Sequence, residues 1–258
     1  MTLPGRIIRE SLRRACRHAL LPAGIAAGMA MAAIAISPAA TNAQPPSRPR
    51  YFPLDQNTPP GVAGQWSTAG RRGATPMPQL IRVELPGDEG EVGFFTQPGA
   101  GATMFDAPAT ATVQVGGVYR LKISGMEDFP GVELYPSVEL LDRLHPPRGR
   151  EAEFPVPITF TAEEIELALQ GRMITKVIYL EQPDRAAPVR NSTAARTRIA
   201  GTQDNPLALA DEAGRPMAIV RLGSRAPDPH AQDPDFFGNW APIQFPADLA
   251  TRTEEARR

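Results

Sequence analysis

Hydrophobic and polar residues alternate along several short stretches in the middle of the chain. In the first of them, Ile81, Val83 and Leu85 alternate with Arg82 and Glu84. A period of two places the apolar side chains on one face of an extended chain, so this run predicts a half-buried β-strand. Similar runs predict further strands at residues 92–96, 112–115, 118–124, 154–160 and 217–222.

Two glycines separate the third and fourth of these runs. Gly116 and Gly117 lie between residues 112–115 and 118–124. Both central residues of a tight hairpin turn need positive φ, which glycine adopts without a steric cost. The pattern therefore predicts a β-hairpin over residues 112–124.

Two other runs indicate where their strands lie in a sheet. Pro155 and Pro157 interrupt the apolar face of residues 154–160, and proline has no backbone N–H to donate to a neighbouring strand. This pattern predicts an edge strand. Residues 173–180 are apolar on both faces except at Thr175 and Lys176, which predicts a central and fully buried strand.

A helix is predicted after residue 160. Thr161 and Glu164 form the sequence of a capping box, in which each side chain accepts a hydrogen bond from an otherwise unpaired backbone amide. Ile165, Ala168 and Leu169 then share one face of a helix, and Gly171 is suited to end it.

The stretch GVELYPSVELLDRLHPP contains the triplet Val-Glu-Leu twice. A hairpin through the intervening Tyr-Pro-Ser would bring Glu133 and Glu139 together, but its arms would have only three residues each. A single strand keeps the period of two straight through Pro136. We therefore expect one extended strand, kinked or at an edge, with Glu133 and Glu139 on its solvent face; the hairpin is the alternative.

The single strand has a consequence for catalysis. Six residues of strand at about 3.3 Å each place the two glutamates roughly 20 Å apart. Carboxylate pairs that cleave glycosides lie about 5–9.5 Å apart. In the expected strand, Glu133 and Glu139 cannot form such a pair.

The first 43 residues have the pattern of a secretory signal peptide. Five arginines in residues 6–17 precede an apolar run at residues 23–36, and small residues follow up to Ala43. Cleavage after Ala43 would remove the single cysteine, Cys16, and leave no thiol or disulfide. An uncleaved anchor is the alternative, because the apolar run can be extended to residues 19–37.

Composition divides the rest of the chain into three parts. Residues 44–79 contain eight prolines and four glycines, which is typical of a linker or a disordered segment. Residues 80–223 hold the predicted strands and the helix, and form the expected β-rich globular domain. Residues 224–258 are again rich in proline and form a C-terminal tail, in which three large aromatic residues favour docking on the domain.

The charge argues against a nucleic-acid-binding protein. The whole chain has a formal net charge of −1. Residues 1–43 carry five arginines and one glutamate, so the part after Ala43 has 22 basic and 27 acidic residues and a net charge of −5. Nucleic-acid-binding domains are usually basic instead.

Candidate site residues are few. No nucleophile elbow, zinc-protease motif or phosphate-binding loop occurs, and we expect no metal or cofactor. His145 could act as a base only with a positioned partner, and Asp142 is the nearest candidate. The residues we single out as a candidate ligand-binding set are Glu133, Tyr135, Glu139, His145 and Tyr179; Trp66 and Trp240 add further aromatic surface.

Three segments resemble a group of conserved exported proteins of planctomycetes. They are GVELYPSVELL, FPVPITFTAEEIELALQGRMITKVIYLEQP and AIVRLG, and the resemblance spans about residues 117–223. TKVIYLEQP is its most specific part. The family has no assigned activity, so the resemblance implies a bacterial envelope location and gives no catalytic residue.

Together these observations predict a mainly β, sandwich-like domain of about seven strands with one short helix, flanked by proline-rich disordered segments. The leading hypothesis is an exported, non-catalytic component of the periplasm or cell envelope with a structural or protein-binding role. A carbohydrate- or small-ligand-binding module is the alternative, and a hydrolase using Glu133, Glu139 or His145 is a third. Expected partners are an envelope protein or a glycan, with membrane contact only through an uncleaved signal segment.

Overall fold

The computed structural model describes residues 50–55, 57–69, 77–97, 101–184, 197–201, 203–228, 230, 234–237 and 242–246. The predicted signal peptide lies outside these residues, as do the first six residues of the predicted linker and the end of the predicted tail.

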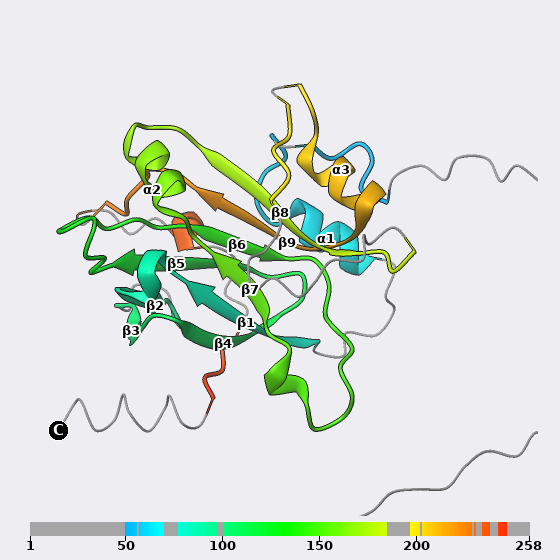
Figure 1. The fold of residues 1–258 in the computed structure, drawn as a ribbon, viewed down its shortest axis with the longest axis horizontal. Coiled ribbons are helices and arrows are strands. Elements are labelled where there is room, and N and C mark those ends of the chain that lie inside the picture. The colour runs from blue at the N-terminus through cyan, green and yellow to red at the C-terminus, as the bar shows by residue number, and fades with distance from the viewer. Residues whose placement is uncertain are drawn as a thin grey trace, which may run out of the picture. The chain divides into compact units, whose positions relative to one another are not determined.

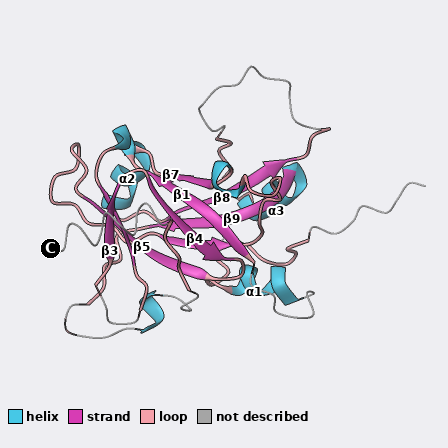
Figure 2. Cartoon of the chain, turned by 90° about the horizontal axis from the view of Figure 1, so that it is seen from below, coloured by secondary structure: helices cyan, strands magenta, loops and turns pink. Residues whose placement is uncertain are grey.

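The described part of the chain folds as a mainly β sandwich (Figures 1 and 2). A three-stranded sheet has the order β4-β1-β7, and a six-stranded sheet has the order β3-β2-β5-β6-β9-β8. The strands are β1 (Pro78–Glu84), β2 (Glu91–Phe94), β3 (Thr103–Asp106), β4 (Ala109–Gln114), β5 (Val118–Ser124), β6 (Ser137–Leu140), β7 (Val156–Thr159), β8 (Ile174–Glu181) and β9 (Gly214–Leu222). The described α-helices are α1 (Val62–Ala69), α2 (Ala162–Leu169) and α3 (Pro206–Ala213). The predicted fold class is confirmed, with two strands and two helices beyond the expected number.

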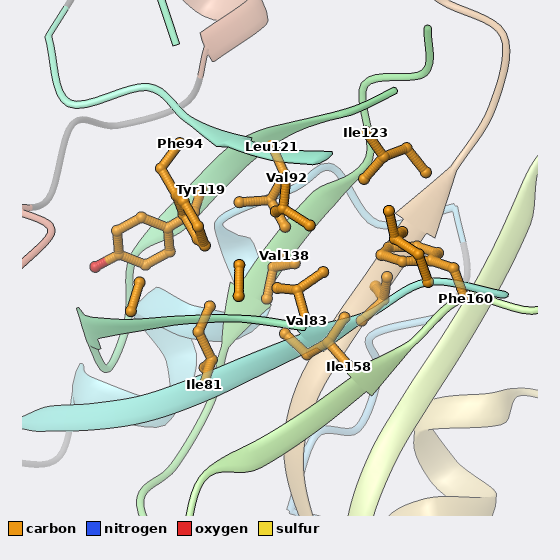
Figure 3. Close-up of a cluster of buried hydrophobic side chains, with 14 of the residues drawn as sticks. Ile81, Val83, Val92, Phe94, Tyr119, Leu121, Ile123, Val138, Ile158 and Phe160 are labelled. Carbon is orange, nitrogen blue, oxygen red and sulfur yellow. The ribbon is translucent and has the colours of Figure 1, made fainter. Parts of the chain in front are cut away.

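The main core lies between the two sheets. Ile81 and Val83 of β1 are fully buried, as their alternation with Arg82 and Glu84 predicts. They pack against apolar side chains from β2, β5, β6 and β7 (Figure 3). Figure 3 labels ten members of this cluster: Ile81, Val83, Val92, Phe94, Tyr119, Leu121, Ile123, Val138, Ile158 and Phe160.

The predicted hairpin at Gly116 and Gly117 is wrong. β4 belongs to the small sheet and β5 to the large one, so the two glycines carry the chain between sheets. Gly116 has φ 87° and donates to the carbonyl of Leu140 at 2.7 Å. The Tyr119 hydroxyl accepts from the amide of Gln114 at 2.6 Å and donates to its carbonyl at 3.1 Å. This hydroxyl bonds the backbone where β4 ends.

The two predictions about strand position have different outcomes. β7 is an edge strand, as its prolines predict, and it runs parallel to β1. β8 is neither central nor fully buried: it is the outer strand of the six-stranded sheet and is half-exposed. Its two faces are apolar because Ile174 and Ile178 pack on the main core while Val177 packs on a second cluster. A strand can thus be covered on both faces by packed side chains and still pair with another strand on only one edge.

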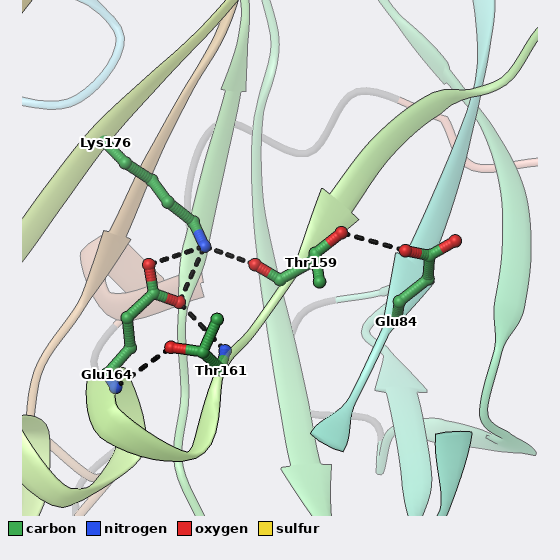
Figure 4. A network of polar contacts seen from close by, with 5 residues as sticks. All are labelled: Glu84, Thr159, Thr161, Glu164 and Lys176. Carbon is green, nitrogen blue, oxygen red and sulfur yellow. Dashed lines mark hydrogen bonds and ion pairs between the residues drawn. The ribbon is translucent and has the colours of Figure 1, made fainter. Parts of the chain in front are cut away.

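The predicted capping box is present at the start of α2 (Figure 4). Thr161 accepts from the amide of Glu164 at 3.2 Å, and the Glu164 carboxylate accepts from the amide of Thr161 at 3.0 Å. The same carboxylate lies 2.7 Å from Nζ of Lys176 on β8, which also donates to the carbonyl of Thr159. One side chain therefore caps α2 and ties it to β8.

Substitution of Thr161 tests this cap. Thr161→Ala is expected to lower the free energy of unfolding by about 1 kcal/mol, because one amide at the start of α2 loses its acceptor. Thr161→Ser keeps the hydroxyl and should retain most of the stability. Urea unfolding measures both; equal losses in the two variants would show that the hydroxyl does not cap the helix.

The predicted linker is wrong for residues 50–55 and 57–69. These residues lie on the sandwich, and residues 62–69 form α1. They supply Tyr51 and Ala63, each 1% exposed, to the second apolar cluster, whose other buried members are Leu141, Leu207 and Ile219. The proline and glycine fraction, averaged over 36 residues, hides a short helix that follows a proline pair. Residues 78 and 79 belong to β1.

The described residues of the C-terminal tail dock on the domain, as their aromatic content predicts. Phe236 is 1% exposed, and Phe245 packs against Phe94 and Phe105 of the core. Gln244 exchanges two backbone hydrogen bonds with Thr112 of β4, at 2.7 and 2.9 Å. The predicted domain boundary at residue 223 is therefore too early.

Candidate binding surface

The two Val-Glu-Leu triplets lie on one extended segment. Leu134 bridges Ile123 of β5, and further along Ser137 pairs with Arg120 in the same antiparallel register. The pairing thus continues through Pro136, whose carbonyl accepts from Leu121 at 2.9 Å. This arrangement confirms the single-strand interpretation and excludes the hairpin.

Glu139 does not lie on a solvent face, which corrects the sequence prediction. Its side chain is fully buried. Oε2 accepts from Nη1 of Arg221 on β9 at 2.9 Å, and Oε1 accepts from the amide of Gly64 in the first turn of α1 at 2.7 Å. Arg221 also donates to the carbonyl of Thr58 at 3.3 Å. Glu139 is buried because α1 covers this end of the segment, and its carboxylate fastens the helix to the sheet.

Glu133, at the other end of the segment, is exposed as predicted. It lies 2.6 Å from Nζ of Lys122 and accepts from the Tyr135 hydroxyl at 2.9 Å. Hydrogen bonds from Lys122 and then Tyr135 hold the pKa of Glu133 below its usual value. The ring of Tyr135 stacks on Phe95 and meets the edge of Phe236. Glu133 and Tyr135 thus share a site, from which Glu139 is absent, and no glycosidase-like carboxylate pair forms.

The pKa of the Tyr135 hydroxyl is raised, which makes the stability of the protein depend on pH in the alkaline range. Burial, and then the hydrogen bond to Glu133, raises the pKa of its hydroxyl to about 12. Because the folded state favours the neutral phenol, its contribution to stability is complete below the pKa of an unfolded tyrosine, about 10, and is lost as pH rises towards 12. Tyr119 has a similarly raised pKa, through burial.

Spectrophotometric titration tests this pKa. The difference between wild type and Tyr135→Phe in phenolate absorbance should have its midpoint near pH 12. A midpoint near 10, the value of a solvated tyrosine, would contradict the environment described for the hydroxyl.

His145 and Asp142 do not form a catalytic pair. His145 is exposed, whereas Asp142 is buried and its Oδ2 lies 3.7 Å from Arg50 and 3.6 Å from Arg215. The carboxylate holds the N-terminal segment to β9. Of the five residues that the sequence singles out, only Glu133 and Tyr135 are in contact.

Tyr179 lies in a different place, on β8. Beside it is a pocket of about 220 Å³ between the end of β8 and α3. Both polar and apolar residues line the pocket: Tyr179, Glu181, Arg198, Leu209, Glu212 and Ala213. A single side chain would fit in this volume.

β8 is an outer strand of the six-stranded sheet and has a neighbouring strand on one edge, β9. β9 pairs with one side of the strand, and no backbone hydrogen bond joins the other side to any described residue. Three exposed apolar side chains accompany it, Leu169 (46%), Met173 (70%) and Leu180 (47%). We call residues 173–181 the β8 edge.

The other described sheet edges are short or blocked. β3 has four residues, β4 is bridged by Gln244, and β7 carries Pro157 beside Pro155. Such features are the usual means by which proteins prevent unwanted strand pairing. β8 has eight residues and no proline or glycine. Sequence reasoning missed this surface because an apolar run does not reveal which neighbours a strand has.

In the described part of the chain, no group of three or more His, Cys, Asp or Glu side chains could hold a metal ion. Among those same residues, every helix is too short or too polar to cross a bilayer. Comparison with protein-family models, curated proteins and solved structures finds no match to the chain.

Proposed function

We propose that the protein is an exported, non-catalytic component of the cell envelope that binds another protein chain through the β8 edge. The observation that carries this proposal is the open, proline-free edge of eight residues. An added strand gains affinity from main-chain hydrogen bonds and specificity from pockets for its side chains. The 220 Å³ pocket beside Tyr179 lies where such a side chain would enter.

The use of the buried charges supports a non-catalytic role. Glu139 is committed to Arg221 and to the start of α1, and Asp142 lies between Arg50 and Arg215. Both carboxylates hold the N-terminal segment on the sheet. Both carboxylates therefore have structural roles, whereas a catalytic carboxylate would be accessible to a substrate.

Export is supported by the sequence. Residues 1–43 have the charged start, apolar run and small residues of a signal peptide. The resemblance to exported planctomycete proteins points to the same location. Retention of the protein in the cytoplasm of its host would contradict this part of the proposal.

Photocrosslinking in the native host tests the binding surface. With a photoreactive amino acid at Leu180, the full-length protein is expected to give a discrete crosslinked protein product from the envelope fraction. The matched control carries the same group at Asp106, which is exposed and lies on β3, the opposite edge of the six-stranded sheet. Equal products at both positions would contradict docking at β8.

A glycan-binding role is the second candidate, favoured by the site at Glu133. There a half-buried Tyr135 ring stacks on Phe95 beside a carboxylate and the Lys122 ammonium. Aromatic faces with polar groups at their rims are typical of ligand sites. If envelope glycans bind here, they should raise the melting temperature of wild type and leave that of Tyr135→Ala unchanged. An equal shift in both proteins would place the glycan elsewhere.

A further inference from the structure

We propose that the chain docked on the β8 edge is a second copy of this protein, joined antiparallel, β8 to β8, so that two six-stranded sheets become one. This inference rests on the proposed function, that the edge binds protein. It adds the identity of the partner and the register of the pairing.

The symmetry of such a dimer fixes how the strands can pair. A two-fold axis perpendicular to the sheet reverses strand direction and keeps each side chain on its own face. The axis must therefore pass beside a residue that faces its own copy. Centring on Lys176 would set two ammonium groups opposite each other, and centring on Ile178 would leave Met173 opposite a proline, Pro183.

Centring on Val177 gives favourable pairs along the strand. Ile174 then faces the partner subunit's Leu180, and Thr175 faces the partner subunit's Tyr179. Cross-strand pairs of β-branched, aliphatic and aromatic side chains are those that stabilise antiparallel sheets. Leu180, which is 47% exposed in the single chain, gains an apolar neighbour. The same register sets Lys176 opposite the partner subunit's Ile178 and Met173 opposite the partner subunit's Glu181, so the favourable pairs are those at positions 174, 175, 179 and 180.

The charges favour the antiparallel direction. Arg172 precedes the strand, whereas Glu181 and Asp184 lie at its end, and all three are exposed. Antiparallel pairing brings the basic end of each strand beside the acidic end of the other. A parallel arrangement would place like charges together, which is unfavourable at short distance.

The elements around β8 leave this edge accessible. α2 packs on the main-core side of the sheet, where Ile165 and Ile178 belong to one cluster. α3 packs on the other face, where Leu207 and Val177 belong to the second cluster. Lys176 is held by Glu164 at 2.7 Å, so pairing at the edge does not bury an uncompensated charge.

The mass of the full-length protein in solution is the first test. Light scattering after size exclusion should give twice the chain mass of 27.8 kDa. Leu180→Arg should raise the dimer dissociation constant at least about tenfold, because two charged side chains then enter an apolar contact. Asp106→Arg places an arginine on β3, at the opposite edge of the same sheet, and should leave the dimer intact. A monomeric wild type, or equal effects of both variants, would overturn the proposal.

Cysteine crosslinking tests the register. In a Cys16→Ser background, Val177→Cys places a thiol opposite its own copy and should give a disulfide-linked dimer on mild oxidation. Leu180→Cys faces the partner subunit's Ile174 and should not. Crosslinking through position 180 in place of position 177 would overturn the register.

The photocrosslink at Leu180 separates this inference from the proposed function. A product that contains only this chain supports both. A product with a different envelope protein overturns the second-copy inference and leaves the proposed function standing. No product specific to position 180 overturns both.

Discussion

Replacement of Glu139 by alanine should lower the free energy of unfolding by about 3–5 kcal/mol, the largest loss we expect from a single side chain in this protein. The substitution leaves Arg221, with 9% of its side chain exposed, without its carboxylate partner. It also removes the acceptor of the Gly64 amide. Urea unfolding followed by tryptophan fluorescence in a Trp240→Phe background, where Trp66 of α1 is the one tryptophan left, reports on the helix that Glu139 fastens.

Glu133 provides the matched control. It lies on the same segment and also contacts a cation, Lys122, but about half of its side chain is exposed. Water screens such a pair, so Glu133→Ala should cost less than about 1 kcal/mol. Glu139→Leu combined with Arg221→Met should recover much of the lost stability, because no unpaired charge stays buried. Equal losses for Glu133→Ala and Glu139→Ala would contradict the burial of Glu139.

Phe236→Ala should cost about 3 kcal/mol or more, because a ring that is 1% exposed leaves a cavity. The guanidinium of Arg120 lies 4.4 Å from this ring and that of Arg225 lies 5.3 Å from it. Both contacts are lost with the ring. Thermal unfolding of the full-length protein measures the effect.

Phe237→Ala is the control for this prediction. Phe237 is adjacent in sequence and only half-buried, so its removal should cost clearly less. If Phe236→Ala left the melting temperature unchanged, the 3₁₀ turn at residues 234–237 would not be part of the stable domain.

Local signals in the sequence identified the elements that they describe. The alternation at Ile81 and Val83 gave the buried face of β1, and the capping box at Thr161 gave the start of α2. The prolines around Val156 identified an edge, and the period through Pro136 gave the right register. Each of these features depends on neighbours within a few residues.

The errors concern contacts between distant parts of the chain. The runs around Gly116 are two strands, but the sequence does not state that they enter different sheets. The apolar run of β8 predicts a central strand, because its packing against elements on both faces is a tertiary property. The period of two predicts that Glu139 faces water, because the helix that covers it, α1, comes from 75 residues earlier in the chain.

The candidate site shows the same division. Glu133 and Tyr135 are two residues apart on one strand, so their shared face followed from the period of two. The aromatic ring of Tyr179 makes it a candidate in the sequence, and the structure places it on the β8 edge. β8 has an open edge because no described strand pairs with its outer side. The residues of β8 do not indicate whether such a neighbouring strand is present.

The anchor of α1 also sets an order of events during synthesis. Residues 62–69 leave the ribosome early, but the Glu139–Arg221 pair that holds the helix needs residue 221. Pairings this far apart along a chain form slowly. Among the described helices α1 is the first to be made, but the ion pair that anchors it is complete only when Arg221 of β9 is present.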